Sequence, residues 1–392
     1  MKITIIEKEI YQLLHLGFNK TYSCKKGYFK YQLNFFLLVL SLQFIFAGEL
    51  LAIGNSSNDT LKFKNGSLNE YVEWHDNRGK LINAHDGGII VVNGKYYWYG
   101  HALRPLGLTK DENNGAATTT GINLYSSTNL HNWKYEGVIL AVSTDTMSPL
   151  RAPLRLERPK IIYNKKTKKF VLWFHYVGFP GTHGQTVGLA DAGVAVANKI
   201  TGPFKYLGHH RPIDDSGAVK DPTLFMDNDT TAYFIYDRKL TDGSRCLHIV
   251  KLTDDFLHAT NQWAKIDIAS NREAPVIIKR NGVYFMVTSG VSGWKVNAAK
   301  VYKAYHLMGP WFEVGNPCSG EGIETTYNSQ CTFAFKVQGV PDLIVIMLER
   351  HNTENFMRCS YVWLPLIFSS AEALYFPYKQ EWNISSLINS KN

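Results

Sequence analysis

The sequence predicts an all-β fold and, within that class, a five-bladed β-propeller. First, a unit made of an apolar strand, a polar turn and an aromatic-rich strand recurs five times along the chain. Second, a weaker motif with the character of an outer strand follows four of these copies. Third, the chain beyond residue 68 shows no amphipathic pattern of helical length. Hairpins that repeat about every 52 to 71 residues favour the blades of a propeller over a sandwich, which is the alternative.

Each recurring unit is expected to be a β-hairpin, because Asn, Asp, Gly or Lys lies at its tip between two apolar stretches. The five hairpins are predicted at residues 87–100, 158–175, 222–237, 274–290 and 331–348. The outer strands are predicted at residues 125–137, 196–208, 251–263 and 302–315. The stretch around Trp74 is expected to pair with residues near Leu374–Tyr378 and so to close the ring.

A leader is predicted ahead of the propeller. Residues 35–47 form an apolar run that ends at small residues, which is short for a membrane span and typical of a signal-peptide core. We therefore expect residues 1–47 to be a signal peptide or anchor with a long leader, residues 48–68 to be a linker, and residues 69–392 to be the propeller. Two alternatives stay open: a start downstream of Met1, and a membrane anchor formed by residues 35–53.

Two further features agree with secretion. Acceptor patterns for N-glycosylation begin at Asn55, Asn58, Asn65, Asn228 and Asn383. The cysteines beyond the leader are Cys246, Cys318, Cys331 and Cys359, and they allow two disulfides in three connectivities. Free buried thiols are the alternative.

The net charge of +9 does not indicate a nucleic-acid partner. The first 34 residues hold six lysines against two glutamates, and the remaining excess is scattered apart from a short run at Lys165–Lys169. That run lies at a predicted turn, so a solvated loop explains it better than a binding patch.

Carboxylic acids recur at the start of the predicted inner strands. When the hairpins are aligned on their turns, the residues before the first strand are Asp86, Glu157, Asp221, Glu273 and Gln330. The innermost strand of each blade lines the axis of a propeller, so we expect these residues to meet at one mouth of the channel. Like charges repel in a partly dry cleft, which favours a functional role for such a cluster over a stabilising one.

Cleavage of a glycosidic bond needs a cluster of this kind. One carboxylic acid protonates the leaving oxygen, and a second carboxylate acts on the opposite face of the sugar. The acid must keep its proton near neutral pH, and a third carboxylate beside it raises its pKa. The sequence therefore favours a glycosidase. A sugar-binding propeller without turnover and a purely structural propeller are the competing hypotheses.

The motifs of the chain resemble those of glycoside hydrolase family 43, and within it the branch that includes exo-β-1,3-galactanases. The resemblance covers about residues 70–382 and rests on INAHDGG (82–88), YYWYG (96–100), ERPK (157–160), KDPTLFMDND (220–229), REAP (272–275), TSGVSGW (288–294) and NSQCTF (328–333). It implies a five-bladed propeller that hydrolyses its substrate with inversion.

The resemblance also implies roles for individual residues. Glu273 matches the general acid, Asp221 matches the aspartate that orients this acid and raises its pKa, and Asp86 matches the general base that activates water. Positions that border the sugar are matched by Glu157, Gln330, Thr288 and Trp294. From its place near an inner strand, His85 is a further candidate for contact with the ligand or with a water.

Two departures from the galactanase branch affect the expected base and substrate. Members of that branch commonly have glycine at the position of Asp86, and the amide at the position of Gln330 serves as their base. This chain has both residues, which favours Asp86 as base. They also commonly have glutamate at the position of His101, where it contacts the terminal galactose. Arabinofuranosidase, galactofuranosidase or xylosidase activity is therefore the alternative to an exo-acting galactosidase or galactanase.

The expected partner is an oligo- or polysaccharide substrate, with no nucleic acid and, once the signal is cleaved, no stable membrane association. The mechanism requires no cofactor and no catalytic metal, and a structural calcium ion in the channel is compatible with the resemblance. We expect a secreted monomer. The sequence leaves open the sugar, the linkage, the disulfide pairing and the cleavage of the leader.

Overall fold

The computed structural model describes residues 61–103, 119–178, 189–214, 216–266, 268 and 271–389. They belong to a unit that spans Leu61–Asn392. The expected leader, with Asn55 and Asn58, lies outside the described residues. Regular structure in the described part is almost entirely β-strand, as predicted, and no helix in it is long and apolar enough to cross a membrane.

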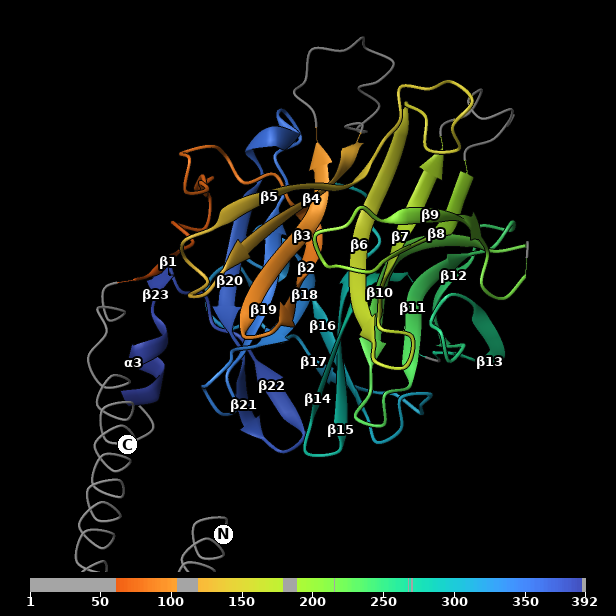
Figure 1. The fold of residues 1–392 in the computed structure, drawn as a ribbon. Coiled ribbons are helices and arrows are strands. Elements are labelled where there is room, and N and C mark those ends of the chain that lie inside the picture. Colours follow the sequence, from red (N-terminus) through yellow and green to blue (C-terminus); the bar gives the residue numbers. More distant parts are fainter. Residues whose placement is uncertain are drawn as a thin grey trace, which may run out of the picture. The chain divides into compact units, whose positions relative to one another are not determined.

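Four antiparallel four-stranded sheets form the first four blades, and a three-stranded sheet forms the fifth (Figure 1). Blade 1 contains β2 (His85–Val92), β3 (Lys95–Leu103), β4 (Thr119–Ser127) and β5 (Lys134–Ala141). Blade 2 contains β6 (Leu154–Asn164), β7 (Lys169–Gly178), β8 (Leu189–Ala197) and β9 (Lys205–His210). Blade 3 contains β10 (Ala218–Met226), β11 (Ala232–Lys239), β12 (Arg245–Leu252) and β13 (Ala259–Lys265). Blade 4 contains β14 (Arg272–Arg280), β15 (Val283–Gly290), β16 (Lys300–Ala304) and β17 (Phe312–Gly315). Blade 5 contains β18 (Gln330–Lys336), β19 (Ile344–Arg350) and β20 (Ser360–Pro365).

The first strand of each blade faces the axis, and these five strands form a closed ring. Strand β2 contacts β6, β6 contacts β10, β10 contacts β14, β14 contacts β18, and β18 returns to β2. A closed ring of five sheets is a five-bladed β-propeller, which confirms the predicted fold.

The core of the protein consists of hydrophobic clusters between neighbouring blades. The indoles of Trp98 in blade 1 and Trp363 in blade 5 lie 4.9 Å apart between ring centroids. Trp173 in blade 2 and Phe234 in blade 3 are also separated by 4.9 Å. Since each sheet is covered on both faces, its strands are apolar on both sides, which explains continuous aromatic runs such as YYWYG. Burial of each such side chain contributes about 1.5–3 kcal/mol.

The chain ends meet in a different way from the expected one. Strand β1 (Phe63–Lys64) pairs with β23 (Glu381–Trp382), which precedes the short helix α3 (Ile384–Asn389). Strand β22 (Ala373–Tyr375) pairs instead with β21 (Ile367–Ser370). The predicted pairing between the Trp74 stretch and residues near Leu374–Tyr378 is therefore wrong.

Aromatic packing explains the actual arrangement of the N-terminal segment. The ring of Trp74 packs against Trp363 and Trp98 at centroid distances of 5.0 and 6.0 Å. Phe63 is buried against Trp382 at 4.4 Å. Residues 61–68, which the sequence assigned to the linker, are thus packed against the propeller.

The four cysteines outside the leader are free thiols in the structure. Cys318, Cys331 and Cys359 are buried, and Cys246 is partly exposed. The structure therefore agrees with the alternative of free thiols rather than with two disulfides.

Candidate active site

Every inner strand carries a one-residue β-bulge near its start. In blades 1 to 4 the pairing with the second strand shifts directly after His85, Glu157, Lys220 and Glu273, and in blade 5 it shifts after Cys331. In the first four blades the next residue has a positive φ; these residues are Asp86 (51°), Arg158 (47°), Asp221 (43°) and Ala274 (54°). Bulges near active sites redirect side chains. The bulges therefore determine which side chains of the inner strands face the mouth of the channel.

The five residues singled out in the sequence do not all hold the same position relative to this bulge. Glu157 and Glu273 lie in the last pair before it, and Asp86 and Asp221 hold the next position. Gln330 lies one pair before Cys331, the last paired residue ahead of the bulge in blade 5. The predicted equivalence of all five is therefore wrong by one residue for Asp86, Asp221 and Gln330. All five nevertheless lie at the same end of their inner strands, as expected.

Glycine makes the bulge of blade 1 different from the others. Gly87 follows Asp86, where the next three blades have proline. A Cβ atom on Gly87 would lie 1.7 Å from the carbonyl oxygen of Tyr99, so only glycine fits this approach of β2 to β3. The close contact of the two strands fixes the backbone that carries Asp86.

Asp86 lies in a pocket at this mouth. The pocket is lined by Asp86, His101, Leu103, Arg155, Glu157, Trp294, Glu349, His351 and Phe356. His351 Nε2 lies 3.3 Å from Asp86 Oδ1, and His101 Nε2 lies 3.6 Å from Asp86 Oδ2. Burial alone would raise the pKa of Asp86, but His351, Arg158 and His101 outweigh it and hold this pKa well below its usual value. Asp86 is therefore ionised at neutral pH, as a general base must be.

Glu349 holds Asp86 in place from blade 5. Its Oε2 accepts the backbone N–H of Asp86 at 2.8 Å, and its Oε1 lies 2.5 Å from His85 Nδ1. The sequence patterns do not single out Glu349 or His351. The hairpin pairing of Glu349 with Gln330 is the signal that would have placed it at this mouth.

Arg158 connects Asp221, the residue expected to raise the pKa of the acid, to Gln330 in blade 5. Its Nε donates to Asp221 Oδ1 at 3.0 Å, and its Nη2 donates to Gln330 Oε1 at 2.5 Å. The Nε2 of Gln330 lies 3.4 Å from Glu273 Oε1. Because the oxygen of this amide is already bound by Arg158, Gln330 is better placed to orient Glu273 than to accept a proton.

Glu273 is set up to hold a proton. Burial raises its pKa, and the negative charge of Asp221 raises it further, to about 8. Arg245, which donates to Glu273 Oε2 at 2.9 Å, and Arg158 act in the opposite direction. Glu273 is thus protonated and Asp86 ionised at neutral pH, and this separation divides the acid and base roles.

Glu157 is ionised and lines the pocket near Asp86. Its Oε1 accepts from Arg155 Nη1 at 2.7 Å, and its Oε2 lies 3.0 Å from His175 Nδ1. Burial raises the pKa of Glu157, but the charges of Arg155 and His175 outweigh burial and lower it below its usual value. A buried, ionised carboxylate at the pocket wall can accept hydrogen bonds from sugar hydroxyls.

The remaining predicted residues differ in their distance from the pocket. Trp294 lines it, and its indole packs edge-on against His351 at 5.0 Å. His85 is buried against Glu349 rather than exposed to the pocket. Thr288 is also buried, where its hydroxyl accepts from Arg272 Nε at 2.9 Å. Its position supports the residue before Glu273 and does not border the pocket.

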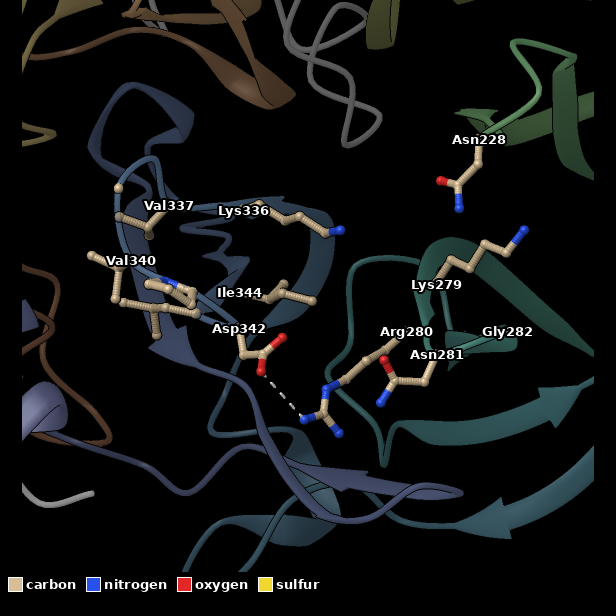
Figure 2. A pocket seen from close by; sticks show the side chains of 13 residues that line it. Asn228, Lys279, Arg280, Asn281, Gly282, Lys336, Val337, Val340, Asp342 and Ile344 are labelled. Atoms are coloured by element: carbon tan, nitrogen blue, oxygen red, sulfur yellow. Dashed lines mark ion pairs between the residues drawn. The ribbon is translucent and has the colours of Figure 1, made fainter. Parts of the chain in front are cut away.

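A second hollow lies at the opposite ends of the inner strands (Figure 2). It is lined by Asn228, Lys279, Arg280, Asn281, Gly282 and Lys336 to Ile344 without Gln338. Figure 2 shows the amines of Lys279 and Lys336 at its rim, and Arg280 paired with Asp342 at 3.8 Å. None of the five acid and amide residues lines this hollow, so it is not the candidate active site.

Two groups of described residues offer metal-ligand atoms within 4.8 Å of one another: Asp86, Glu349 and His351, and His85, Glu349 and Cys359. Calcium prefers six to eight oxygen ligands. The first group supplies two carboxylates and one imidazole, and the second supplies one carboxylate with imidazole and thiol. These residues match calcium poorly, so no step is assigned to it.

Comparison with known proteins identifies the family of the chain. The family described as glycosyl hydrolases family 43 matches residues 81–322 of the chain. The chain belongs to this family. As a family 43 member, the protein is a glycoside hydrolase that acts on O-glycosyl bonds. The comparison with curated protein sequences gave no match.

Solved structures of family 43 enzymes superpose on most of the chain. A β-1,3-galactosidase determined with galactodeoxynojirimycin is 31% identical, with a TM-score of 0.73 over 82% of this chain and 100% of its own. An exo-β-1,3-galactanase from Clostridium thermocellum is 32% identical, with a TM-score of 0.69 over 82% of this chain and 66% of its own. An exo-β-1,3-galactanase from Phanerochaete chrysosporium, determined with β-1,3-galactotriose, is 27% identical, with a TM-score of 0.68 over 83% of this chain and 68% of its own.

Proposed function

We propose that this family 43 protein is an inverting, exo-acting glycosidase that releases terminal galactose from β-1,3-linked galactosides. The observation that carries the proposal is the opposed protonation of two buried carboxyl groups, Glu273 with a pKa raised to about 8 and Asp86 with a lowered one. The choice of galactose rests on the similar structures, which are β-1,3-galactosidases and exo-β-1,3-galactanases.

The reaction follows from these two groups. Glu273 donates its proton to the glycosidic oxygen as the bond between that oxygen and the anomeric carbon breaks. Asp86 accepts a proton from a water molecule, and the hydroxide oxygen bonds to the anomeric carbon from the opposite face. The sugar leaves with inverted configuration, Glu273 ends ionised and Asp86 ends protonated. Transfer of one proton through solvent restores both groups.

Asp221, Glu157 and Trp294 support this reaction in different ways. The charge of Asp221 keeps the proton on Glu273. Glu157 accepts hydrogen bonds from hydroxyls of the bound sugar, and the partly exposed indole of Trp294 covers an apolar face of it.

A second candidate specificity has an observation in its favour. His101 lies 3.6 Å from Asp86, and burial lowers the pKa of His101 to about 4, so it is neutral in the working range. A neutral imidazole recognises a sugar hydroxyl differently from the carboxylate expected there in galactanases. An arabinofuranoside, galactofuranoside or xyloside is therefore the alternative substrate.

The test is a substrate panel with product stereochemistry. The purified protein would be incubated with nitrophenyl β-galactoside, α-arabinofuranoside, β-galactofuranoside and β-xyloside, and with β-1,3-galactan. Proton NMR of the first-formed sugar would give its anomeric configuration. The proposal expects α-galactose released from β-1,3-galactan. Release of β-galactose, or hydrolysis of the furanosides or the xyloside alone, would contradict it.

We also infer that the protein is secreted and carries a glycan at Asn228 rather than at Asn65. Asn228 is exposed in the turn after β10, whereas Asn65 is buried and its Nδ2 donates to the carbonyls of Trp363 and Lys379, both at 2.9 Å. After expression through a secretory pathway, peptide mass spectrometry should find a glycan on Asn228 and none on Asn65. An active secreted enzyme with a glycan on Asn65 would contradict this assignment.

A further inference from the structure

One guanidinium is shared between two carboxyl groups beside the predicted acid. Arg245, the first residue of β12, donates from Nη2 to Glu273 Oε2 at 2.9 Å. Its Nε donates to Asp237 Oδ2 at 2.6 Å, and its Nη2 also bonds to that oxygen. Asp237 lies on β11, so the second strand of blade 3 supplies an anion and the third supplies a cation, and the cation reaches Glu273 on the inner strand of blade 4.

Burial of the Asp237 carboxylate costs desolvation free energy. Its side chain is 0% exposed, and its Oδ1 accepts no hydrogen bond from any residue in the described ranges. Burial raises the pKa of Asp237 to about 6, against the opposing charge of Arg245. An apolar residue would avoid the cost of desolvating this group. The position of Asp237 next to Arg245 therefore points to a role at the site.

The role follows from what an unshared arginine would do. A guanidinium within hydrogen-bond distance of a carboxyl group favours its ionised form. Glu273 must be protonated to donate to the leaving group, so a full pairing with Arg245 would weaken it as an acid. Asp237 competes for the same guanidinium, and it binds Arg245 through two nitrogens where Glu273 has one.

We propose that Asp237 and Arg245 are positioning residues for the reaction. Asp237 holds the guanidinium of Arg245 away from full pairing with Glu273, so Arg245 fixes the direction of the Glu273 carboxyl group without removing its proton. This inference rests on the proposed role of Glu273 as general acid.

Other charged groups also face Glu273 and Asp237 and stay in place in the test. Asp221 on β10 and Arg158 on β6 act on Glu273, and the amide of Gln330 on β18 contacts it. On the other side, Asp221 and Lys220 of β10 act on Asp237. The variants below leave each of these groups unchanged.

The experiment measures the alkaline limb of the pH profile of kcat/KM on the best substrate. Asp237→Asn keeps an acceptor for Arg245 but removes the competing charge, so Arg245 pairs more fully with Glu273. The limb should move to lower pH by roughly one unit. Arg245→Gln removes the cation, so the limb should move to higher pH. Arg245→Lys keeps the charge and should leave the limb closer to that of the unmodified protein than Arg245→Gln does.

The double variant Asp237→Asn/Arg245→Gln separates positioning from a merely structural effect. Asp237 also raises the pKa of Glu273 directly through its negative charge. Without Arg245 only this direct effect is left, so adding Asp237→Asn to Arg245→Gln should move the limb less than Asp237→Asn moves it in the unmodified protein. This double variant leaves no unpaired buried charge, so it serves as the test if either single variant does not fold. Its alkaline limb should lie at higher pH than that of the unmodified protein. Limbs that do not move, or single variants that shift in the same direction, would overturn the inference.

Glu273→Gln, assayed in parallel, distinguishes the two ways of failing. If activity and the alkaline limb persist in Glu273→Gln, the proposed function itself is wrong. If Glu273→Gln abolishes activity while the Asp237 and Arg245 variants keep an unshifted limb, only the positioning role is wrong.

Discussion

The backbone N–H of Asp86 donates to the Glu349 carboxylate at 2.8 Å, across the junction between the first and the last blade. Asp86 has a positive φ of 51°, a conformation that costs free energy for residues other than glycine and is held only by its surroundings. The bond from Glu349 is one such restraint, and the close approach of Gly87 to β3 is another. Closure of the propeller thus fixes the proposed base.

Asp86→Asn should lower kcat by at least about two orders of magnitude, the usual scale for loss of a general base. The neutral amide keeps the shape of Asp86 but cannot accept a proton from water. Gln330→Ala serves as the comparison and should lower kcat less than Asp86→Asn does, because Gln330 orients Glu273 and Arg158 but takes no proton. Steady-state kinetics with both variants would assign the base to Gln330 instead if the larger loss of kcat falls on Gln330→Ala.

The pH profile should reflect the proton on Glu273. Because kcat/KM reports groups of the free enzyme, activity should fall as pH rises through about 8, where Glu273 loses its proton. The acidic limb should lie at strongly acidic pH, since Asp86 has a pKa well below its usual value. Asp221→Asn removes a charge that raises the pKa of Glu273, so the alkaline limb should move to lower pH. An alkaline limb that stays in place would show that Asp221 does not tune Glu273.

The sequence was sufficient for the architecture and for the mouth of the channel. The hairpin repeats and their acids follow from local patterns, because turn residues and alternating apolar stretches are local signals. Relative to the bulge of its own blade, each of Asp86 and Asp221 lies one position later than Glu273 does, and local patterns could not predict this difference. A bulge inserts a residue without changing the composition of the strand, so spacing to the turn does not reveal it.

Partners that depend on long-range pairing were also beyond the sequence. Glu349 and His351 reach Asp86 because blade 5 closes on blade 1, at a separation of more than 260 positions along the chain. Asp237 reaches Glu273 through Arg245, which lies on the next strand. No short motif contains any of these pairs, so only the folded ring brings them together.

His101 and Asp86 should be coupled in substrate choice. His101→Glu alone would place a second carboxylate near Asp86, where His101 Nε2 is now 3.6 Å away, and repulsion between the two should impair the enzyme. Asp86→Gly in the same chain removes that repulsion and gives the pair expected in galactanases. The double variant should therefore bind a β-1,3-linked galacto-oligosaccharide more tightly than His101→Glu does, without regaining turnover, because it lacks the proposed base.

Calorimetric titration of a β-1,3-linked galacto-oligosaccharide into both single variants and the double variant measures this coupling in binding affinity. Effects that simply add, with no recovery of affinity in the double variant, would show that His101 does not act through Asp86. Thermal unfolding of each variant is the control, because both positions are buried.

The most direct test of the account compares Glu273→Gln with the unmodified protein on substrates that differ in their need for a proton. A sugar leaving group requires protonation, whereas dinitrophenolate is stable without it. Glu273→Gln should lose at least about two orders of magnitude of kcat/KM on a β-1,3-linked galacto-oligosaccharide and much less on dinitrophenyl β-galactoside. Near-normal turnover of the oligosaccharide by Glu273→Gln would contradict the assignment of Glu273 as general acid.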